Sequence, residues 1–285
     1  MLRLDGSIVA QERKVALAKS VEDFTQKQGR KPGLAVVIVG ADPASQVYVK
    51  NKVKTTSEVG MNSFHFELPA TATQAEIIAQ VKKLNADPAV DGILVQLPLP
   101  TGIDSDIVTE AILPEKDPDG LTTGNLGLLF AGKKRVAPCT PFGVMKILEH
   151  YKIPVKGRKA VVIGRSNIVG KPMAQLLLEA DATVTVCHSR TTDLMHHTLD
   201  ADIVVVAAGK PRFLGGEAFA KNSVVIDVGI HRPTEGAFAG KLCGDVRFEE
   251  LEHTAAATPV PKGVGPMTIQ MLMENTLRLA ELRAK

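Results

Sequence analysis

The chain has 285 residues, of which 45% are hydrophobic and 23% are charged, proportions that fit a folded globular protein and exclude a mainly disordered one. The formal net charge is only +3, too small a surplus to suggest binding to nucleic acid. Trp is absent and aromatic residues make up 4%, so a stacking platform for single strands is not expected. We therefore expect no nucleic-acid partner.

The cysteines and the apolar runs point to a reducing compartment. Cys139, Cys187 and Cys243 are odd in number and widely spaced, with neither a CxxC pair nor a zinc-binding spacing, so we expect free thiols and no metal site. Residues 1–6 contain no apolar signal core, and no apolar run approaches the ~20 residues that span a bilayer. These features predict a cytoplasmic chain with no membrane partner.

The first part of the chain alternates between helix and strand patterns. A stripe of apolar residues predicts a helix over 7–28, and residues 47–59 carry polar and basic residues at helical spacing. Thr73 and Glu76 have the spacing of a capping box ahead of a further helix. Continuous or alternating apolar residues predict strands at 34–39, 62–68 and 92–97, which lie between and after these helices. The alternation is typical of an α/β fold.

A connector and a second α/β pattern follow. Residues 113–140 are rich in Gly, Pro and Asp and look like a link between domains, after which Thr140 and Pro141 predict a helix with Thr140 as its N-cap. The remaining patterns predict strands at 160–164, 183–186, 203–207 and 224–228, and helices at 172–179 and 267–283. We expect one domain formed by residues 1–119 plus 268–285, and another formed by residues 120–267.

Residues 162–172 form a glycine-containing turn between a strand and a helix. Such a turn brings the chain close to a pyrophosphate, which the free N–H groups at the helix N-terminus can bind. The pattern departs from GxGxxG because Ser166 stands where the second glycine would be. A purely structural turn is the alternative interpretation.

The next strand indicates which dinucleotide is preferred. In a NAD site this strand usually ends in an acid that binds the ribose 2′-hydroxyl, but here it ends in CHSR, residues 187–190. Arg165 and Ser189, with Arg190 or His188, could hold a 2′-phosphate by charge-assisted hydrogen bonds. The sequence therefore favours NADP over NAD.

Polar residues in the first domain form a second candidate site. Tyr48 and Lys52 are four residues apart and share one face of a helix, and Gln96 lies near the end of a buried strand, where it needs hydrogen-bond partners. Asp119 belongs to the turn sequence DPDG. Each has an ordinary alternative: a solvated lysine, a satisfied core glutamine and a plain turn.

Taken together, these stretches resemble the bifunctional methylenetetrahydrofolate dehydrogenase/methenyltetrahydrofolate cyclohydrolase family over essentially the whole chain. The stretches that carry the resemblance are DPASQVYVKNK, VQLPLP, EKDPDG, PCTP, VVIGRSNIVGKP, VTVCHSR, VIDVGI, GDV and TPVPKGVGPMT. The resemblance implies two α/β domains flanking a cleft, the second a Rossmann-like NADP-binding domain. It also implies a homodimer, for which the exposed strand edge of the second domain would be the natural contact.

The resemblance also implies residue roles. Lys52 resembles the catalytic lysine of the cyclohydrolase step, Tyr48 packs against the aminobenzoyl part of the folate, Gln96 orients Lys52, and Asp119 binds the pterin. The implied cofactor-binding residues are Gly164, Arg165, Ser166, Ser189, Arg190 and Ile230, with Thr140 as a neighbour. The implied substrate-binding residues also include Leu97, Pro98, Pro261 and Gly263.

The sequence departs from the family at two places. Lys262 replaces a glycine of the usual PGGVGP loop, which puts the local loop shape in question because glycine serves where φ is positive or space is short. Residues 121–130 match the family less closely than the other stretches.

Two other functions fit parts of the sequence. A monofunctional NADP-dependent oxidoreductase acting on a small hydroxy acid would use one of the histidines His188, His196, His197 or His231 as its proton carrier. A non-catalytic nucleotide sensor would bind the dinucleotide without turnover.

Overall fold

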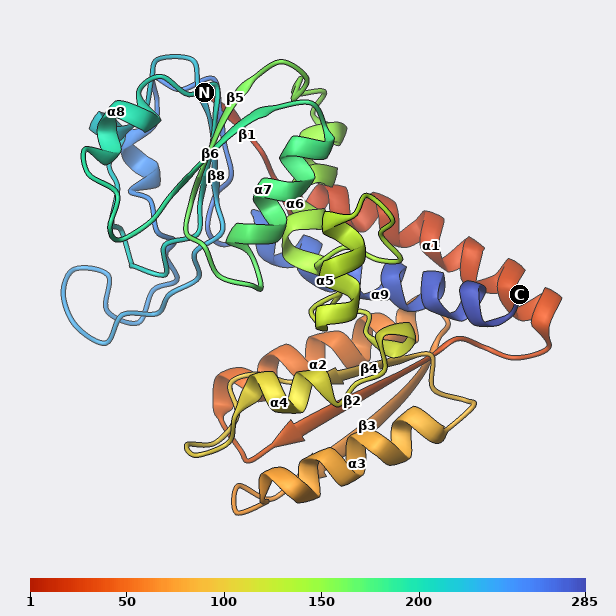
Figure 1. The fold of residues 1–285 in the computed structure, drawn as a ribbon. Helices are drawn as coiled ribbons and strands as arrows, with labels where there is room; N and C mark the ends of the chain where they lie inside the picture. Colours follow the sequence, from red (N-terminus) through yellow and green to blue (C-terminus); the bar gives the residue numbers. More distant parts are fainter. The chain divides into compact units, whose positions relative to one another are not determined.

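The computed structural model describes residues 1–285, apart from the side chains of residues 43–45 and 47. The chain divides into two compact units, each with its own parallel sheet (Figure 1). Residues 12–139 and 269–285 form the unit that we call the β2 unit, and residues 1–11 and 140–268 form the β5 unit. The predicted domains place residues 1–11, 120–139 and 268 differently. The predicted domains separate folate chemistry from dinucleotide binding, and their boundaries stay a prediction.

The β2 unit is built on the strand order β3-β2-β4, with all pairs parallel. The central strand β2 (Gly33–Val39) is buried at every residue, because α2 (Pro43–Glu58) packs on one face and α3 (Gln74–Ala86) on the other. The strands on either side of it are β3 (Asn62–Leu68) and β4 (Gly92–Val95). The predicted capping box of Thr73 and Glu76 is present.

Three short helical elements and most of two long helices complete this unit. The remaining elements are α4 (Ser105–Glu110), the 3₁₀ turn η1 (Pro114–Lys116), α5 (Thr123–Phe130), and most of the long helices α1 (Gly6–Gln28) and α9 (Val264–Arg283). The predicted connector 113–140 therefore contains a helix, α5, that sequence patterning missed. Its two glycines are poor helix formers, and the helix begins because the Thr122 side chain accepts a hydrogen bond from Asn125 N.

The β5 unit has the strand order β1-β9-β8-β7-β5-β6, again with every pair parallel. Its strands are β1 (Leu2–Arg3), β5 (Lys159–Ile163), β6 (Thr183–Cys187), β7 (Ile203–Val206), β8 (Val224–Asp227) and β9 (Ala256–Ala257). Its helical elements are α6 (Cys139–His150), α7 (Gly170–Glu179), α8 (Leu194–Thr198), η2 (Gly216–Ala218) and η3 (Phe248–Glu250). The predicted α/β class is confirmed for both units.

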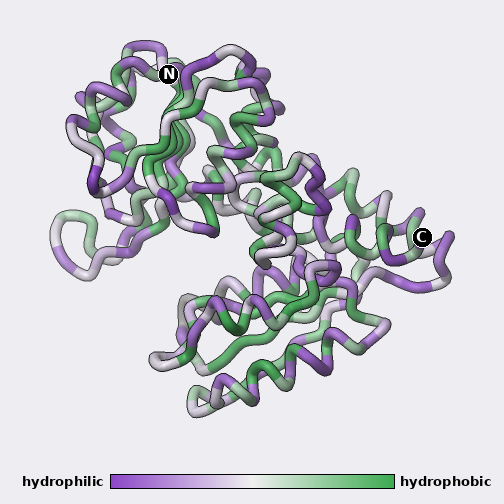
Figure 2. The backbone as a smooth tube through the Cα atoms, in the orientation of Figure 1, coloured by the Kyte–Doolittle hydropathy of each residue, from purple (hydrophilic) through white to green (hydrophobic). Residues whose placement is uncertain are grey.

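The central strands β2, β5, β7 and β8 are strongly hydrophobic and carry much of the buried core of the two units (Figure 2). One predicted boundary is wrong: α6 begins at Cys139, so Thr140 is inside the helix and not its N-cap. The Thr140 hydroxyl instead lies 3.0 Å from the Thr268 hydroxyl. Within the described residues, no helix combines the length and apolar character needed to cross a membrane.

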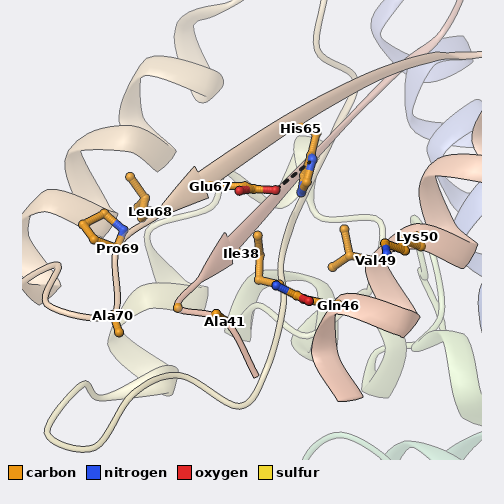
Figure 3. Close-up of a pocket in the computed structure, with 11 residues that line it drawn as sticks. Ile38, Ala41, Gln46, Val49, Lys50, His65, Glu67, Leu68, Pro69 and Ala70 are labelled. Atoms are coloured by element: carbon orange, nitrogen blue, oxygen red, sulfur yellow. Dashed lines mark ion pairs between the residues drawn. The ribbon is translucent and has the colours of Figure 1, made fainter. Parts of the chain in front are cut away.

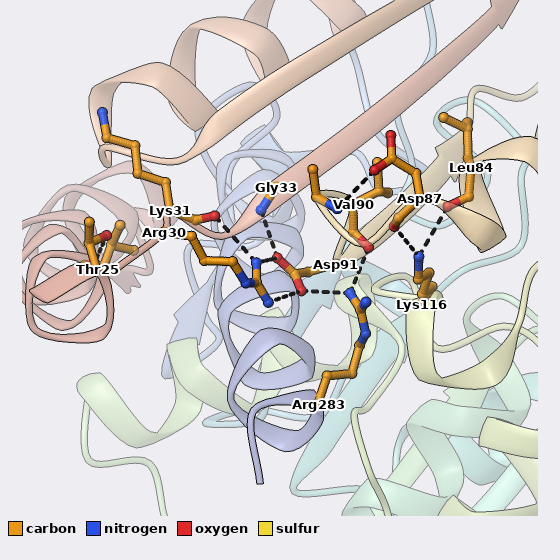
Figure 4. A network of polar contacts seen from close by, with 12 residues as sticks. Thr25, Arg30, Lys31, Gly33, Leu84, Asp87, Val90, Asp91, Lys116 and Arg283 are labelled. Carbon is orange, nitrogen blue, oxygen red and sulfur yellow. Dashed lines mark hydrogen bonds and ion pairs between the residues drawn. The ribbon is translucent and has the colours of Figure 1, made fainter. Parts of the chain in front are cut away.

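A buried carboxylate fastens the C-terminal helix to the β2 sheet (Figure 4). The Asp91 side chain is fully buried, and its oxygens accept hydrogen bonds from Arg30 at 2.7 and 2.8 Å, from Gly33 N at 3.0 Å and from Arg283 Nη1 at 2.6 Å. Arg283 also donates to the carbonyl of Val90 at 2.6 Å. Two cations thus balance the one buried anion, which makes its burial tolerable.

Replacing Arg283 by Met should lower the free energy of unfolding by about 1–3 kcal/mol, because it removes charge-assisted hydrogen bonds from a buried carboxylate. Urea denaturation measures the change. The matched control is Arg278→Met, since Arg278 is an exposed arginine of the same helix. Equal stabilities of the two variants would contradict a fastening role for Arg283.

Candidate functional site

Lys52 and Gln96 contact each other at the carboxyl end of β4. The Nζ atom of Lys52 donates a hydrogen bond to Oε1 of Gln96 at 2.9 Å, and Nε2 of Gln96 donates to the carbonyl of Leu97 at 2.5 Å. The backbone N–H of Gln96 continues the strand by donating to Val37 O. Helix α2 and strand β4, far apart in sequence, therefore deliver an amine and the amide that orients it.

The amine sits in an environment that disfavours its charged form. Burial lowers the pKa of Lys52 below the value of an exposed lysine, against the opposing effects of Asp119 and Cys139. Its hydrogen-bond acceptor, Gln96, is neutral and cannot compensate for lost hydration as a carboxylate would. The neutral form of this amine is therefore more accessible than that of an exposed lysine.

Asp119 is presented by a rigid turn. The carboxylate of the neighbouring Asp117 is buried and accepts hydrogen bonds from Gly120 N at 2.9 Å, Thr122 N at 2.8 Å and Asn125 Nδ2 at 3.0 Å. The DPDG sequence thus forms the plain turn that the sequence analysis gave as the alternative to a folate-binding role. It also leaves Asp119 close enough to Lys52 to raise the pKa of the lysine.

Two residues to which the sequence analysis assigned no role support this turn. Asn275 of α9 donates from Nδ2 to the carbonyls of Pro118 at 2.7 Å and Ala137 at 2.9 Å. The thiol of Cys139 donates to Pro118 O at 3.3 Å. Burial raises the pKa of Cys139 well above that of an exposed thiol, and Asp119 adds to the effect. Nothing in local spacing connects Asn275 with this turn, so only the fold reveals it.

Three other predicted folate-binding residues of the β2 unit lie close in sequence to Lys52 or Gln96. Tyr48 lies one helical turn before Lys52 on α2, and 40% of its surface is exposed. Leu97 is partly buried and Pro98 is exposed, directly after Gln96. The aromatic ring and the amine are therefore available on one helix face.

A separate hollow of about 590 Å³ lies at the carboxyl ends of β2 and β3 (Figure 3). Side chains from α2, β2 and β3 line it, among them Gln46, Lys50, His65 and Glu67. None of the predicted site residues is part of this lining. Helix α2 turns Lys50 toward the hollow, whereas Lys52 reaches Gln96.

In the β5 unit, a pocket of about 280 Å³ lies at the carboxyl end of β5, the strand that is flanked by β6 and β7. Ligands of open α/β sheets bind at such a point. Its lining residues come from the carboxyl ends of those three strands and from the segments after them: Ile163, Gly164, Arg165, Ser166, His188, Ser189, Leu194, Ala207, Ala208, Lys210 and Phe213. The structure therefore brings four of the predicted cofactor residues together.

The turn after β5 requires the glycine at its first position. Gly164 has φ +123°, and a Cβ atom there would lie 2.2 Å from the carbonyl oxygen of Ala207. Ser166, at the position of the missing second glycine, uses its hydroxyl to accept hydrogen bonds from Val169 N at 3.2 Å and Gly170 N at 3.4 Å. Ser166 thus caps the start of α7 and is compatible with the turn.

The charge of this pocket fits a phosphate. Its lining includes Arg165 and Lys210, and among the described lining residues there is no carboxylate. A ribose 2′-phosphate would meet cations and the Ser189 hydroxyl, whereas an acid would repel it. The donors present therefore fit NADP.

Three predicted cofactor residues lie outside this pocket lining. Arg190 is exposed and its backbone N–H donates to Nδ1 of His188 at 3.1 Å. Ile230 is 43% exposed, and its Cδ1 atom lies 3.4 Å from where a Cβ of Gly265 would be. Thr140 bonds to Thr268. Ile230 and Thr140 therefore gather at the first turn of α9.

The loop of Pro261 and Gly263 precedes that turn. Gly263 is buried, and a Cβ there would lie 2.3 Å from the carbonyl oxygen of Pro259. Between them, Lys262 has φ +79° and its carbonyl accepts a hydrogen bond from Ser7 N at 3.2 Å. The backbone at position 262 thus adopts the positive φ that favours glycine, although lysine is present.

Comparison with known proteins identifies the family. The models described as tetrahydrofolate dehydrogenase/cyclohydrolase, catalytic domain and NAD(P)-binding domain match residues 4–119 and 138–284, respectively. The chain belongs to the tetrahydrofolate dehydrogenase/cyclohydrolase family. The predicted family is therefore confirmed.

Relatives of this family match the chain from end to end. The bifunctional protein FolD of Bdellovibrio bacteriovorus is 59% identical over 286 residues, covering 100% of this chain and 98% of that protein. The crystal structure of FolD from Campylobacter jejuni has a TM-score of 0.94 at 46% identity and covers 99% of both chains. A Trypanosoma brucei FolD structure, complexed with NADP and an inhibitor, has a TM-score of 0.94 at 38% identity and covers 100% of this chain and 99% of that one.

The family loop allows a direct test of the lysine at position 262. A residue with a Cβ atom costs about 1–2 kcal/mol at positive φ relative to glycine, and a β-branched residue costs more, so Lys262→Val should lower the free energy of unfolding below that of the parent chain. Lys262→Gly should be at least as stable as the parent chain. Thermal or urea unfolding of both variants measures the order, and a valine variant as stable as the glycine variant would contradict the assigned backbone shape.

Proposed function

We propose that Lys52, oriented by Gln96, carries the hydrolytic step in a chain that has two activities. The chain is an NADP-dependent methylenetetrahydrofolate dehydrogenase and a methenyltetrahydrofolate cyclohydrolase. It converts 5,10-methylenetetrahydrofolate to 5,10-methenyltetrahydrofolate and then to 10-formyltetrahydrofolate. The observation that carries the proposal is the 2.9 Å contact between the amine and the neutral amide, with Asp119 and Cys139 nearby.

In the oxidative step, the protein mainly holds its reactants. NADP⁺, when bound, accepts the hydride that leaves the methylene carbon of the folate. The substrate nitrogens supply the electron push, so no protein nucleophile is needed. Alignment of two reactants can supply up to ~7–11 kcal/mol in favourable cases.

In the hydrolytic step, a water oxygen attacks the methenyl carbon between N5 and N10 of the folate. One water proton goes to the neutral Nζ of Lys52, and the adduct keeps the other as a hydroxyl. That hydroxyl proton passes to N5 as the bond between the carbon and N5 breaks, leaving the formyl group on N10. An unperturbed lysine is too highly protonated for this role. Burial lowers the pKa of Lys52, which increases the fraction of neutral amine that can accept a proton.

Asp119 and Tyr48 would bind the folate itself. A carboxylate matches the amino group and ring N–H edge of a pterin, because both are hydrogen-bond donors. The half-exposed ring of Tyr48 offers a surface on which the aminobenzoyl group can pack. Leu97 and Pro98 follow Gln96, and we assign them, with Pro261 and Gly263, to the substrate.

NADP would be held by the residues at the carboxyl ends of β5 and β6. Gly164 and Ser166 shape the turn for the pyrophosphate, and Arg165 with Ser189 binds the 2′-phosphate. We assign Ile230, Thr140 and Arg190 to the same cofactor as more distant contacts. In this proposal residues 1–119 plus 268–285 carry the folate chemistry and residues 120–267 bind the dinucleotide.

We further propose a cytoplasmic homodimer. Strand β6 ends the sheet order and pairs with β5 along one edge. Val186 on β6 and Leu178 on α7 are 40% and 56% exposed, which suits an edge that pairs with a second copy. Sedimentation of the purified chain tests the dimer, and a monomer at micromolar concentration would refute it.

A spectrophotometric assay separates this function from its alternatives. Methylenetetrahydrofolate with NADP⁺ should give methenyl absorbance that then decays by hydrolysis. A hydroxy-acid oxidoreductase would show no turnover of this folate. A nucleotide sensor would bind NADP⁺ and turn over neither substrate.

Lys52→Met should reduce cyclohydrolase turnover by about 10²–10⁴-fold, because it removes the general base while keeping the length of the side chain. The rate of loss of methenyl absorbance measures this. Lys50→Met is the control, since Lys50 is exposed on the same helix and lies beside the separate hollow. Unchanged turnover in the Lys52 variant would remove Lys52 from the mechanism.

Gln96→Glu should shift the cyclohydrolase pH profile to higher pH. Turnover rises as pH passes upward through the lowered pKa of Lys52, because only the neutral amine accepts a proton. A carboxylate at 2.9 Å would stabilise the ammonium form, raise that pKa and slow the enzyme at neutral pH by about tenfold or more. An unshifted profile in the variant would show that turnover does not depend on the neutral amine.

Arg165→Ala should raise the KM for NADP⁺ by about 10–100-fold, since a charge-assisted hydrogen bond contributes about 1.5–3 kcal/mol. The KM for NAD⁺, which lacks the 2′-phosphate, should change little. Arg158→Ala is the matched control, because Arg158 precedes the opposite end of β5 and pairs with Asp202. Equal changes for both dinucleotides would refute recognition of the phosphate.

A further inference from the structure

Asp245 is a buried carboxylate that neither activity uses directly. It is fully buried and lies in the GDV stretch, for which the sequence suggested no role. Its Oδ2 atom accepts hydrogen bonds from Ala208 N at 2.6 Å and Gly209 N at 2.9 Å, and its Oδ1 atom accepts one from Lys210 N at 3.0 Å. Three successive backbone N–H groups thus converge on one side chain.

The segment that these bonds hold is a wall of the dinucleotide pocket. Ala207, Ala208 and Lys210 line that pocket after the end of β7. Consecutive N–H groups that point at one place form an anion-binding concavity, and here the protein supplies the anion itself. Asp245 is not among the lining residues, so it supports the wall from behind.

The same carboxylate reaches the segment that follows β8. Nε2 of His231 lies 2.6 Å from Oδ1 of Asp245, and His231 directly follows Ile230, one of the proposed cofactor contacts. The backbone of His231 is fixed in addition by paired hydrogen bonds with Cys243. One buried group therefore ties together the segments after two neighbouring strands, β7 and β8.

A second carboxylate fixes the position of Asp245. Asp227 at the end of β8 accepts hydrogen bonds from Asp245 N at 3.0 Å, Val246 N at 2.9 Å and Gly229 N at 2.9 Å. The approach is so close that a Cβ on Gly229 would lie 2.4 Å from Oδ1 of Asp245. Asp245 thus has little freedom to leave the three N–H groups that it accepts from.

We propose that Asp245 is the positioning residue of the dinucleotide site: by holding residues 208–210 and His231, it fixes one wall of the pocket and the segment that carries the proposed contact Ile230. This inference rests on the proposed assignment of the pocket to NADP. The preorganised wall lowers the ordering cost of binding, so loss of the carboxylate weakens dinucleotide binding before it affects the folate chemistry at Lys52.

Asp245→Asn tests the proposal, because in either orientation of the amide its NH2 group opposes at least one of the N–H groups of residues 208–210. The dissociation constant for NADPH, followed by its fluorescence, should rise by about tenfold or more, as should the KM for NADP⁺. Cyclohydrolase turnover of methenyltetrahydrofolate, measured without dinucleotide, should stay within about twofold of the parent chain. Glu252→Gln, an exposed acid of the same unit, is the matched control.

Two variants of His231 keep the test decisive if the Asp245 variant does not fold. Gln can place an N–H donor where Nε2 of His231 lies, so His231→Gln should retain NADPH affinity, whereas His231→Leu should weaken it severalfold. Unchanged affinity in Asp245→Asn or in His231→Leu would overturn the proposal. So would an equal loss of NADPH binding and of cofactor-free cyclohydrolase turnover, since that pattern marks a merely structural residue. Failure of the proposed function would appear in the parent chain, as absence of NADPH binding.

Discussion

The hydrolytic step that we propose depends on keeping one lysine amine away from bulk water beside a neutral partner. Lys52 donates to Gln96 at 2.9 Å, and burial lowers its pKa. If the partner were a carboxylate, the ammonium form would be favoured and the amine could not accept a proton from water. The identity of residue 96 thus decides what residue 52 can do.

Rigid supports keep that amine and the nearby carboxylate in place. The carboxylate of Asp117 accepts hydrogen bonds from backbone N–H groups of its own turn, and Asn275 of the C-terminal helix donates to the carbonyls of Pro118 and Ala137. Arg283 anchors the same helix to Asp91. The polar groups near the site are therefore satisfied before a substrate arrives, which reduces the rearrangement that binding requires.

Both units use the same architectural principle. In each one, parallel strands end at a common edge where backbone N–H groups and side chains converge. The β2 unit places Gln96 at that edge, and the β5 unit places Gly164, Ser189 and the segment held by Asp245 there. The sheets differ in the residues that follow the strands, and in the function we propose those residues separate folate chemistry from dinucleotide binding.

The sequence by itself determined the α/β class, most helices and strands, and the family, because apolar periodicity and short motifs are local properties. It did not find α5, whose glycines weaken the helical pattern, and it placed the start of α6 wrongly, since the Thr140 hydroxyl faces Thr268. Only the tertiary structure brought Cys139 and Asn275 to the DPDG turn, and Asp245 to residues 208–210. Those contacts join residues distant in the chain, and their partners are set by how the strands and helices pack, which no local spacing encodes.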